Sequence, residues 1–134
     1  MCGVTSVGNS PSFAIRAQSL GKPNIREHQF DAWAELFKEA GHFPNVYCKL
    51  SGMVTEARPG WTDASLAPFV QAAVGAFGYR RLMFGSDWPV CLLAGAYERV
   101  LGALRGALAQ VLKTPSAEDE ARLFERTATG FYAL

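Results

Sequence analysis

The sequence predicts an α/β fold built from consecutive strand–helix units. Three short apolar segments without helical spacing start near residues 12, 45 and 81, which is 33 and 36 residues apart, and helical patterns follow them. Because a strand, its crossover helix and two loops occupy roughly 30 residues or more, each interval is one βα unit and the strands are expected to be parallel. Eight such units make up the usual (β/α)8 barrel of roughly 250 residues. This chain accommodates about three units plus a final helix.

The first unit begins after residues 1–11, which we interpret as a flexible lead-in. The predicted domain covers residues 12–134, and residues 12–17 are expected to form its first strand. From about residue 26 to 40 the apolar residues recur at i, i+3, i+4 and i+7, with charged residues on the other side. This spacing predicts an amphipathic helix that ends near Gly41.

The second unit starts with a strand over residues 45–50, in which side chains alternate between two faces. One face carries Val46, Cys48 and Leu50, and the other carries Tyr47, Lys49 and Ser51. The segment Met53–Trp61 is expected to be a polar loop. Since proline is tolerated in the first turn of a helix, Pro68 favours a helix start at Ser65 over a start at Thr62.

The third unit contains the strand Leu82-Met83-Phe84, which Pro89 prevents from continuing. Gly85 leaves room for the close approach of another backbone. A helix from about residue 94 to 112 follows, with a continuous apolar stripe. A last helix is expected to begin with Thr114 as its cap and Pro115 in its first position.

Asp87 follows the third strand at its carboxyl end. In parallel α/β sheets this edge binds ligands, since the loops carry polar groups while the strands hold them rigidly. The alternative is that Asp87 caps a turn, as aspartate commonly does.

Composition limits the classes of function. The net charge is +1, and no basic cluster or stripe of aromatic residues is present, so nucleic-acid binding is not expected. No apolar run approaches about 18 residues, and the N-terminus does not read as a secretion signal. The three cysteines are widely spaced, which indicates neither disulfides nor a zinc knuckle. We therefore expect a cytoplasmic protein without membrane or nucleic-acid partners.

Three motifs in order, at the spacing of βα units, carry a resemblance to a known family. They are Leu20-Gly21-Lys22-Pro23, then the stretch from Asn45 to Glu56, then Phe84-Gly85-Ser86-Asp87-Trp88-Pro89-Val90, with Phe131-Tyr132-Ala133-Leu134 at the end. Together they resemble the C-terminal part of amidohydrolase-related proteins, and within these the sugar-lactone hydrolases of the fuconolactonase and rhamnonolactonase type. The resemblance implies a partial (β/α)8 TIM barrel whose sixth, seventh and eighth strands lie in this chain.

The resemblance also implies roles for individual residues. Asp87 matches the aspartate that acts as a general base on the attacking water. Lys22, Lys49, Ser51 and Trp88 are the corresponding candidates for substrate binding. The structural alternatives are an exposed cation for Lys49, a turn residue for Ser51 and a packed aromatic for Trp88.

The chain departs from the family pattern where a metal ligand is expected. Gln18 and Ser19 stand where the family carries an Asp-His pair, and the His-x-His segment of the first barrel strand is absent. His28 and His42 do not replace these ligands, because we expect both side chains to be solvated. The full-length family is compatible with a divalent metal, whereas no metal or other cofactor is expected in this chain. A truncated gene product would account for these departures.

Three hypotheses follow from the sequence. The first is a hydrolase whose ancestral substrate is a small-molecule sugar lactone. The second is a catalytically inactive fragment of a barrel. The third is a subunit that needs a partner with the N-terminal half, or a homo-oligomer, to complete the barrel.

Overall fold

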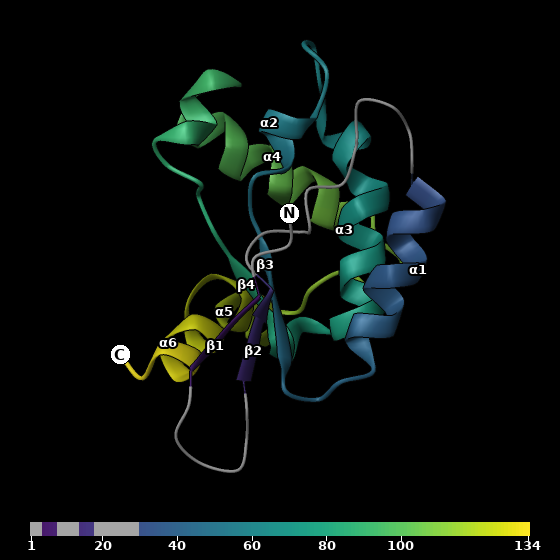
Figure 1. Ribbon diagram of the computed structural model, residues 1–134. Helices are drawn as coiled ribbons and strands as arrows, with labels where there is room; N and C mark the ends of the chain where they lie inside the picture. The colour runs from purple at the N-terminus through teal and green to yellow at the C-terminus, as the bar shows by residue number, and fades with distance from the viewer. Residues whose placement is uncertain (1–3, 8–13, 18–29) are drawn as a thin grey trace.

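The computed structural model describes residues 4–7, 14–17 and 30–134 of the chain. Its four-stranded sheet has the order β1-β2-β3-β4 (Figure 1). Strand β1 (Val4–Val7) pairs antiparallel with β2 (Ala14–Ala17). Strands β3 (Val46–Leu50) and β4 (Leu82–Phe84) continue the sheet in parallel with β2. The predicted α/β class with parallel strands is confirmed.

Helices occupy most of the remaining described residues. The α-helices are α1 (Phe30–Gly41), α2 (Met53–Glu56), α3 (Asp63–Phe77), α4 (Tyr97–Ala109), α5 (Ala117–Ala121) and α6 (Thr127–Tyr132). Two short 3₁₀ segments, η2 (Tyr79–Arg81) and η3 (Val90–Leu93), flank β4, and the π-helical segment η4 (Arg122–Arg126) joins α5 to α6. No helix among the described residues has both the length and the apolar character needed to cross a membrane.

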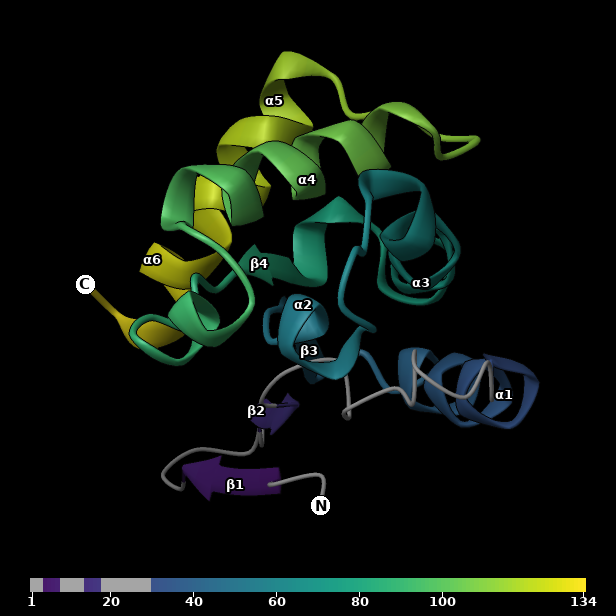
Figure 2. The same ribbon diagram turned by 90° about the horizontal axis from the view of Figure 1, so that it is seen from above.

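The sheet divides the molecule into two sides (Figure 2). Helices α1 and α3 lie on one side of the row of strands, and α6 lies on the other side near β4. Strand β3 alternates as predicted, with Val46, Cys48 and Leu50 buried and Tyr47 and Lys49 only half-buried. We call the side of the sheet that carries Tyr47 and Lys49 the inner face.

The core lies between the opposite face of the sheet and α3 and α4. Leu66, Val70 and Ala73 of α3 are completely buried, and Leu104 and Ala107 of α4 pack into the same cluster. Helix α1 covers α3 through aromatic contacts, with the Trp33 ring against Phe69 at 5.2 Å and Phe37 against Phe77 at 5.1 Å. The predicted amphipathic character of α1 and its end at Gly41 are confirmed.

The start of α3 corrects the sequence prediction. The helix begins at Asp63, with Thr62 as its N-cap, and Pro68 is its sixth residue. A reciprocal capping arrangement accounts for the earlier start, because the Thr62 backbone N–H donates to Ser65 Oγ at 3.2 Å and the two hydroxyls lie 3.3 Å apart.

The last helices also begin differently from the prediction. Helix α4 is shorter than expected at both ends, and α5 is capped by Ser116 instead of Thr114. The Asp119 N–H donates to Ser116 Oγ at 3.2 Å while the Ser116 N–H donates to the Asp119 carboxylate at 3.1 Å. This closed pair of bonds fixes the helix start two residues later.

Two further segments differ from the prediction. Residues 4–7 form β1 although they fall in the expected flexible lead-in, and their Val-Thr-Ser-Val sequence is rich in the β-branched residues that strands favour. Met53–Glu56 forms the short helix α2 within the expected polar loop, because Met53 and Val54 are buried in the core.

Candidate functional site

The carboxyl ends of β3 and β4 lie side by side at one edge of the sheet. Leu50 pairs with Phe84, and the Gly85 N–H donates to the Leu50 carbonyl at 3.2 Å. A side-chain carbon at Gly85 would lie only 2.8 Å from Ser51 Cβ and 4.0 Å from Lys49 Cδ. The predicted close approach at Gly85 is therefore confirmed, and it brings Ser51 and Lys49 next to the segment that leads to Asp87.

Asp87 follows the end of β4 by three residues, and its backbone is held in place. It adopts the left-handed conformation with φ 56°, which aspartate tolerates better than most residues. Its carbonyl accepts a hydrogen bond from the Cys91 N–H at 2.8 Å, and Cys91 is completely buried. The half-buried Asp87 side chain is thus carried on a loop that is anchored in the core.

Trp88 lies mostly in solvent in this chain. Its backbone N–H donates to Ser86 Oγ at 3.2 Å, while 66% of the residue is exposed. Val90, Leu92 and Leu93 of the following segment are exposed as well. The loop after β4 therefore presents a run of large apolar side chains beside Asp87.

Lys49 is the last residue but one of β3 and lies on the inner face. Its Nζ lies 5.5 Å from the centre of the Tyr132 ring, which belongs to the last residue of α6. The neighbouring Tyr47 ring lies 4.9 Å from Phe131. The sequence pattern alone does not predict that Phe131 and Tyr132 lie near Tyr47 and Lys49.

Lys22, together with Gln18, Ser19 and His28, lies outside the residues that the structure describes. His42 is exposed, as predicted. Neither of the buried residues Cys48 and Cys91 forms a disulfide.

Comparison with known proteins decides the family. The model of the amidohydrolase family matches residues 20–134, which include the edge formed by β3 and β4. The chain belongs to the amidohydrolase family.

Two similar amidohydrolase relatives carry the same name. The chain is 42% identical to L-fucono-1,5-lactonase of Burkholderia multivorans. The match covers 85% of the present chain and 41% of the relative. It is 41% identical to L-fucono-1,5-lactonase of Burkholderia ambifaria over 65% of its own length and 30% of that protein. The chain thus spans less than half the length of these curated relatives.

A solved amidohydrolase from Burkholderia multivorans, crystallised with bound zinc, has a similar structure. The TM-score is 0.79 at 38% sequence identity, and the match covers 89% of this chain and 43% of that one. Within 4–7, 14–17 and 30–134 of the present chain, no three His, Cys, Asp or Glu side chains come close enough together to hold a metal ion. The described residues therefore do not hold a zinc ion by themselves.

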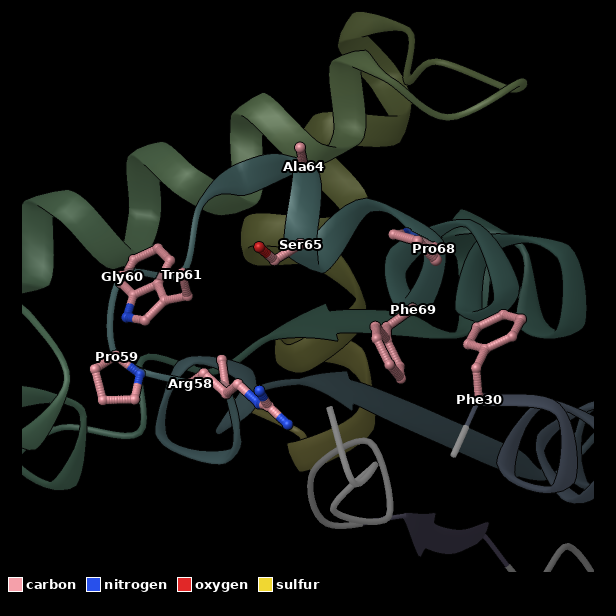
Figure 3. A pocket seen from close by; sticks show the side chains of 10 residues that line it. Phe30, Arg58, Pro59, Gly60, Trp61, Ala64, Ser65, Pro68 and Phe69 are labelled. Carbon is pink, nitrogen blue, oxygen red and sulfur yellow. The ribbon is translucent and has the colours of Figure 1, made fainter. Parts of the chain in front are cut away.

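A cavity of about 480 Å³ lies elsewhere on this amidohydrolase chain. Figure 3 shows Pro59 and Trp61 on one side of it and Phe30 and Phe69 on the other, with Arg58 between them. Asp87, Lys49, Ser51 and Trp88 are not among the residues that line it. The cavity is mainly apolar and is separate from the candidate site.

Proposed function

We propose that this chain supplies the last three βα units of an amidohydrolase (β/α)8 barrel that hydrolyses a sugar lactone. Three findings support this proposal: the family match over residues 20–134, the two relatives named L-fucono-1,5-lactonase, and the likeness to a solved amidohydrolase. The substrate is accordingly a small cyclic ester of a sugar acid, and the activity is that of a hydrolase.

The observation that carries the mechanism is the contact of Gly85 with Ser51 and Lys49, two residues before Asp87. It sets Ser51 and Lys49 beside the segment that leads to Asp87, at the carboxyl edge of parallel strands, where rigid elements hold loop residues in place. Ester hydrolysis needs a base for the attacking water and a positive group or donor for the developing oxyanion. Asp87 and Lys49 have the chemistry for these two roles.

In the proposed reaction, the Asp87 carboxylate takes a proton from water while the water oxygen attacks the lactone carbonyl carbon. The Lys49 ammonium stabilises the negative charge that develops on the carbonyl oxygen. Collapse of the tetrahedral intermediate breaks the bond to the ring oxygen, which receives the proton from Asp87. The product is the open hydroxy acid.

Three other residues have proposed roles in binding the substrate. Ser51 offers a hydroxyl beside Lys49, and Trp88 offers an apolar surface with one N–H donor. Lys22 of the Leu-Gly-Lys-Pro motif is assigned to substrate binding by the family resemblance. Carbohydrate recognition combines such polar groups with apolar walls.

Completion of the barrel requires strands that the described residues do not supply. Strand β4 has a single partner, β3, within the described sheet, and the missing strands correspond to more than half of the relatives' length. The N-terminal units, or further copies of this chain, would have to pair with that edge and replace the antiparallel β1 beside β2. The exposed apolar residues after β4 support burial by such a partner.

The experiment measures hydrolysis of a panel of sugar 1,4- and 1,5-lactones by pH-stat. The full chain is assayed alone and mixed with the N-terminal part of Burkholderia multivorans L-fucono-1,5-lactonase that this chain does not match, and the size of each species is determined by light scattering. We expect turnover in the assembled species, and Asp87→Asn should lower kcat roughly 100-fold or more.

Asp31→Asn is the matched control, since Asp31 is an exposed aspartate in the first turn of α1. It should leave turnover unchanged. Activity that survives Asp87→Asn would overturn the assignment of the base. No turnover in either preparation would favour the inactive-fragment hypothesis.

A further inference from the structure

The C-terminal residues of the chain extend a row of aromatic rings across the inner face. The Tyr47 ring lies 4.9 Å from Phe131, and Phe131 meets Tyr132 edge to face at 5.1 Å. The Lys49 Nζ lies 5.5 Å from the Tyr132 ring centre. An ammonium within about 6 Å of an aromatic ring centre is attracted by the negative face of the ring.

The fold holds α6 in this position from several directions. Leu123 of η4 is almost completely buried, and Phe124 lies 5.5 Å from Phe84 of β4. The buried Thr127 donates to the Arg80 carbonyl at 3.5 Å. These contacts tie the last helix to β4 and the segment before it, so the place of the Tyr132 ring is set by the packing of the domain.

The end of α6 is closed by its own backbone. Ala133 adopts the left-handed conformation with φ 55°, and the Leu134 N–H donates to the Thr129 carbonyl at 3.0 Å. This is the usual geometry of a helix terminus that satisfies its last carbonyl groups. The final turn therefore presents Tyr132 to β3 as part of a folded element.

We infer that Tyr132 is a positioning residue for Lys49. Its ring holds the ammonium on the inner face, where the Lys49 stem passes Gly85 and Ser51. The last helix of the chain thus forms one wall of the candidate site. This inference deepens the proposed function and rests on it for the role of Lys49 in hydrolysis.

The first test measures acetylation rates of individual lysines at fixed pH by peptide mass spectrometry. Tyr132→Leu should raise the rate at Lys49 roughly two- to fivefold, as expected for loss of a cation–π contact at a partly exposed site. Tyr132→Phe, which keeps the ring, should retain the original rate. The exposed Lys38 on α1 is the internal reference.

Tyr97→Leu is the matched control, because it removes a tyrosine ring that lies against Phe84, with 6.5 Å between the ring centres. It should leave the Lys49 rate unchanged. The inference is overturned if Tyr132→Leu and Tyr97→Leu give the same Lys49 rate. Reactivity of the buried Cys91 thiol reports whether either variant has unfolded.

A second measurement is made on the unmodified chain and so does not depend on the folding of the Tyr132 variants. The ring of Tyr132 should shift the NMR signals of the Lys49 ε-methylene protons upfield relative to those of Lys38, with Lys49→Arg identifying the signals. Unshifted signals would overturn the inference. Both readouts are independent of lactone turnover, so this inference and the proposed function fail separately.

Discussion

Gly85 at the end of β4 lies directly against Ser51 at the end of β3. A side-chain carbon at position 85 would approach Ser51 Cβ to 2.8 Å and Ser51 Oγ to 3.0 Å. Gly85→Ala should therefore push the two strand ends apart and lower the free energy of unfolding by about 1–3 kcal/mol. Urea denaturation followed by circular dichroism measures this change.

Gly102→Ala is the matched control for this substitution. Gly102 lies in α4, and nothing would lie within 4 Å of an added side-chain carbon. Alanine is better than glycine in a helix by about 0.5–1 kcal/mol, so this variant should be as stable as the original chain or more stable. Equal stability of the two variants would contradict the close contact at Gly85.

The sequence predicted a close approach at Gly85, without identifying Ser51 as the neighbour, and it predicted the faces of β3, because both depend on local patterns. A period of two assigns Cys48 and Leu50 to one face and Lys49 to the other, and an isolated glycine after a strand indicates close approach. The helical spacing of α1 is equally local. The same spacing also identifies the face of α1 that packs against the rest of the domain.

The features that the sequence did not predict depend on contacts between residues that are far apart in the chain or that no repeating pattern relates. The contact of Lys49 with Tyr132 links β3 to the last helix, and alternation along β3 does not identify the partner of a half-buried lysine. The start of α3 at Asp63 depends on the reciprocal bonding of Thr62 and Ser65, which the position of Pro68 does not reveal. Lys22 lies outside the described residues, so its role stays a prediction.

Tyr79 should make stability fall at high pH. Burial, and to a smaller extent the nearby Asp119 carboxylate, raises the pKa of Tyr79 to about 12 from its ordinary value of 10.0. Between these values the unfolded chain loses the phenolic proton while the folded chain keeps it. Ionisation of Tyr79 in the unfolded chain should therefore lower the free energy of unfolding by about 1.4 kcal/mol for each pH unit in this range. Below pH 10 the phenol is protonated in both states, and its stabilising effect is fully present.

The measurement compares urea melts of the original chain and Tyr79→Phe from pH 8 to 12. At pH 8 the variant should be less stable by about 1 kcal/mol, because the Tyr79 hydroxyl donates to the Lys113 carbonyl. As the pH rises above 10 the two stabilities should converge and then cross at about pH 11, because the loss from Tyr79, about 1.4 kcal/mol per pH unit, comes to exceed that difference. Parallel curves would contradict the raised pKa of Tyr79.

Arg81 joins three segments through backbone carbonyl groups. Its guanidinium donates to the carbonyls of Gly41 at 2.8 Å, Phe43 at 2.7 Å and Val46 at 3.2 Å. Arg81→Met keeps much of the side-chain volume but leaves these acceptors without the charged donor. The free energy of unfolding should fall by about 2–3 kcal/mol.

Arg80→Met tests whether charge alone explains that loss. Arg80 is exposed and lies next to Arg81, so both variants remove one positive charge at almost the same place. The Arg80 variant should stay within about 0.5 kcal/mol of the original chain. Thermal melts that rank the two variants equally would rule out a specific role for the carbonyl contacts.

Leu104 in α4 lies in the core between α3 and the sheet, with 1% of the residue exposed. Leu104→Ala should lower the free energy of unfolding by about 2–5 kcal/mol, since it removes buried methyl groups and leaves a cavity. Leu112, which is 94% exposed, provides the same substitution without burial. Leu112→Ala should change stability by less than about 0.5 kcal/mol in the same urea melts. If Leu104→Ala left stability unchanged, α4 would not pack on α3 in solution. The position of the loop that carries Asp87, which leads into α4, would then also be wrong.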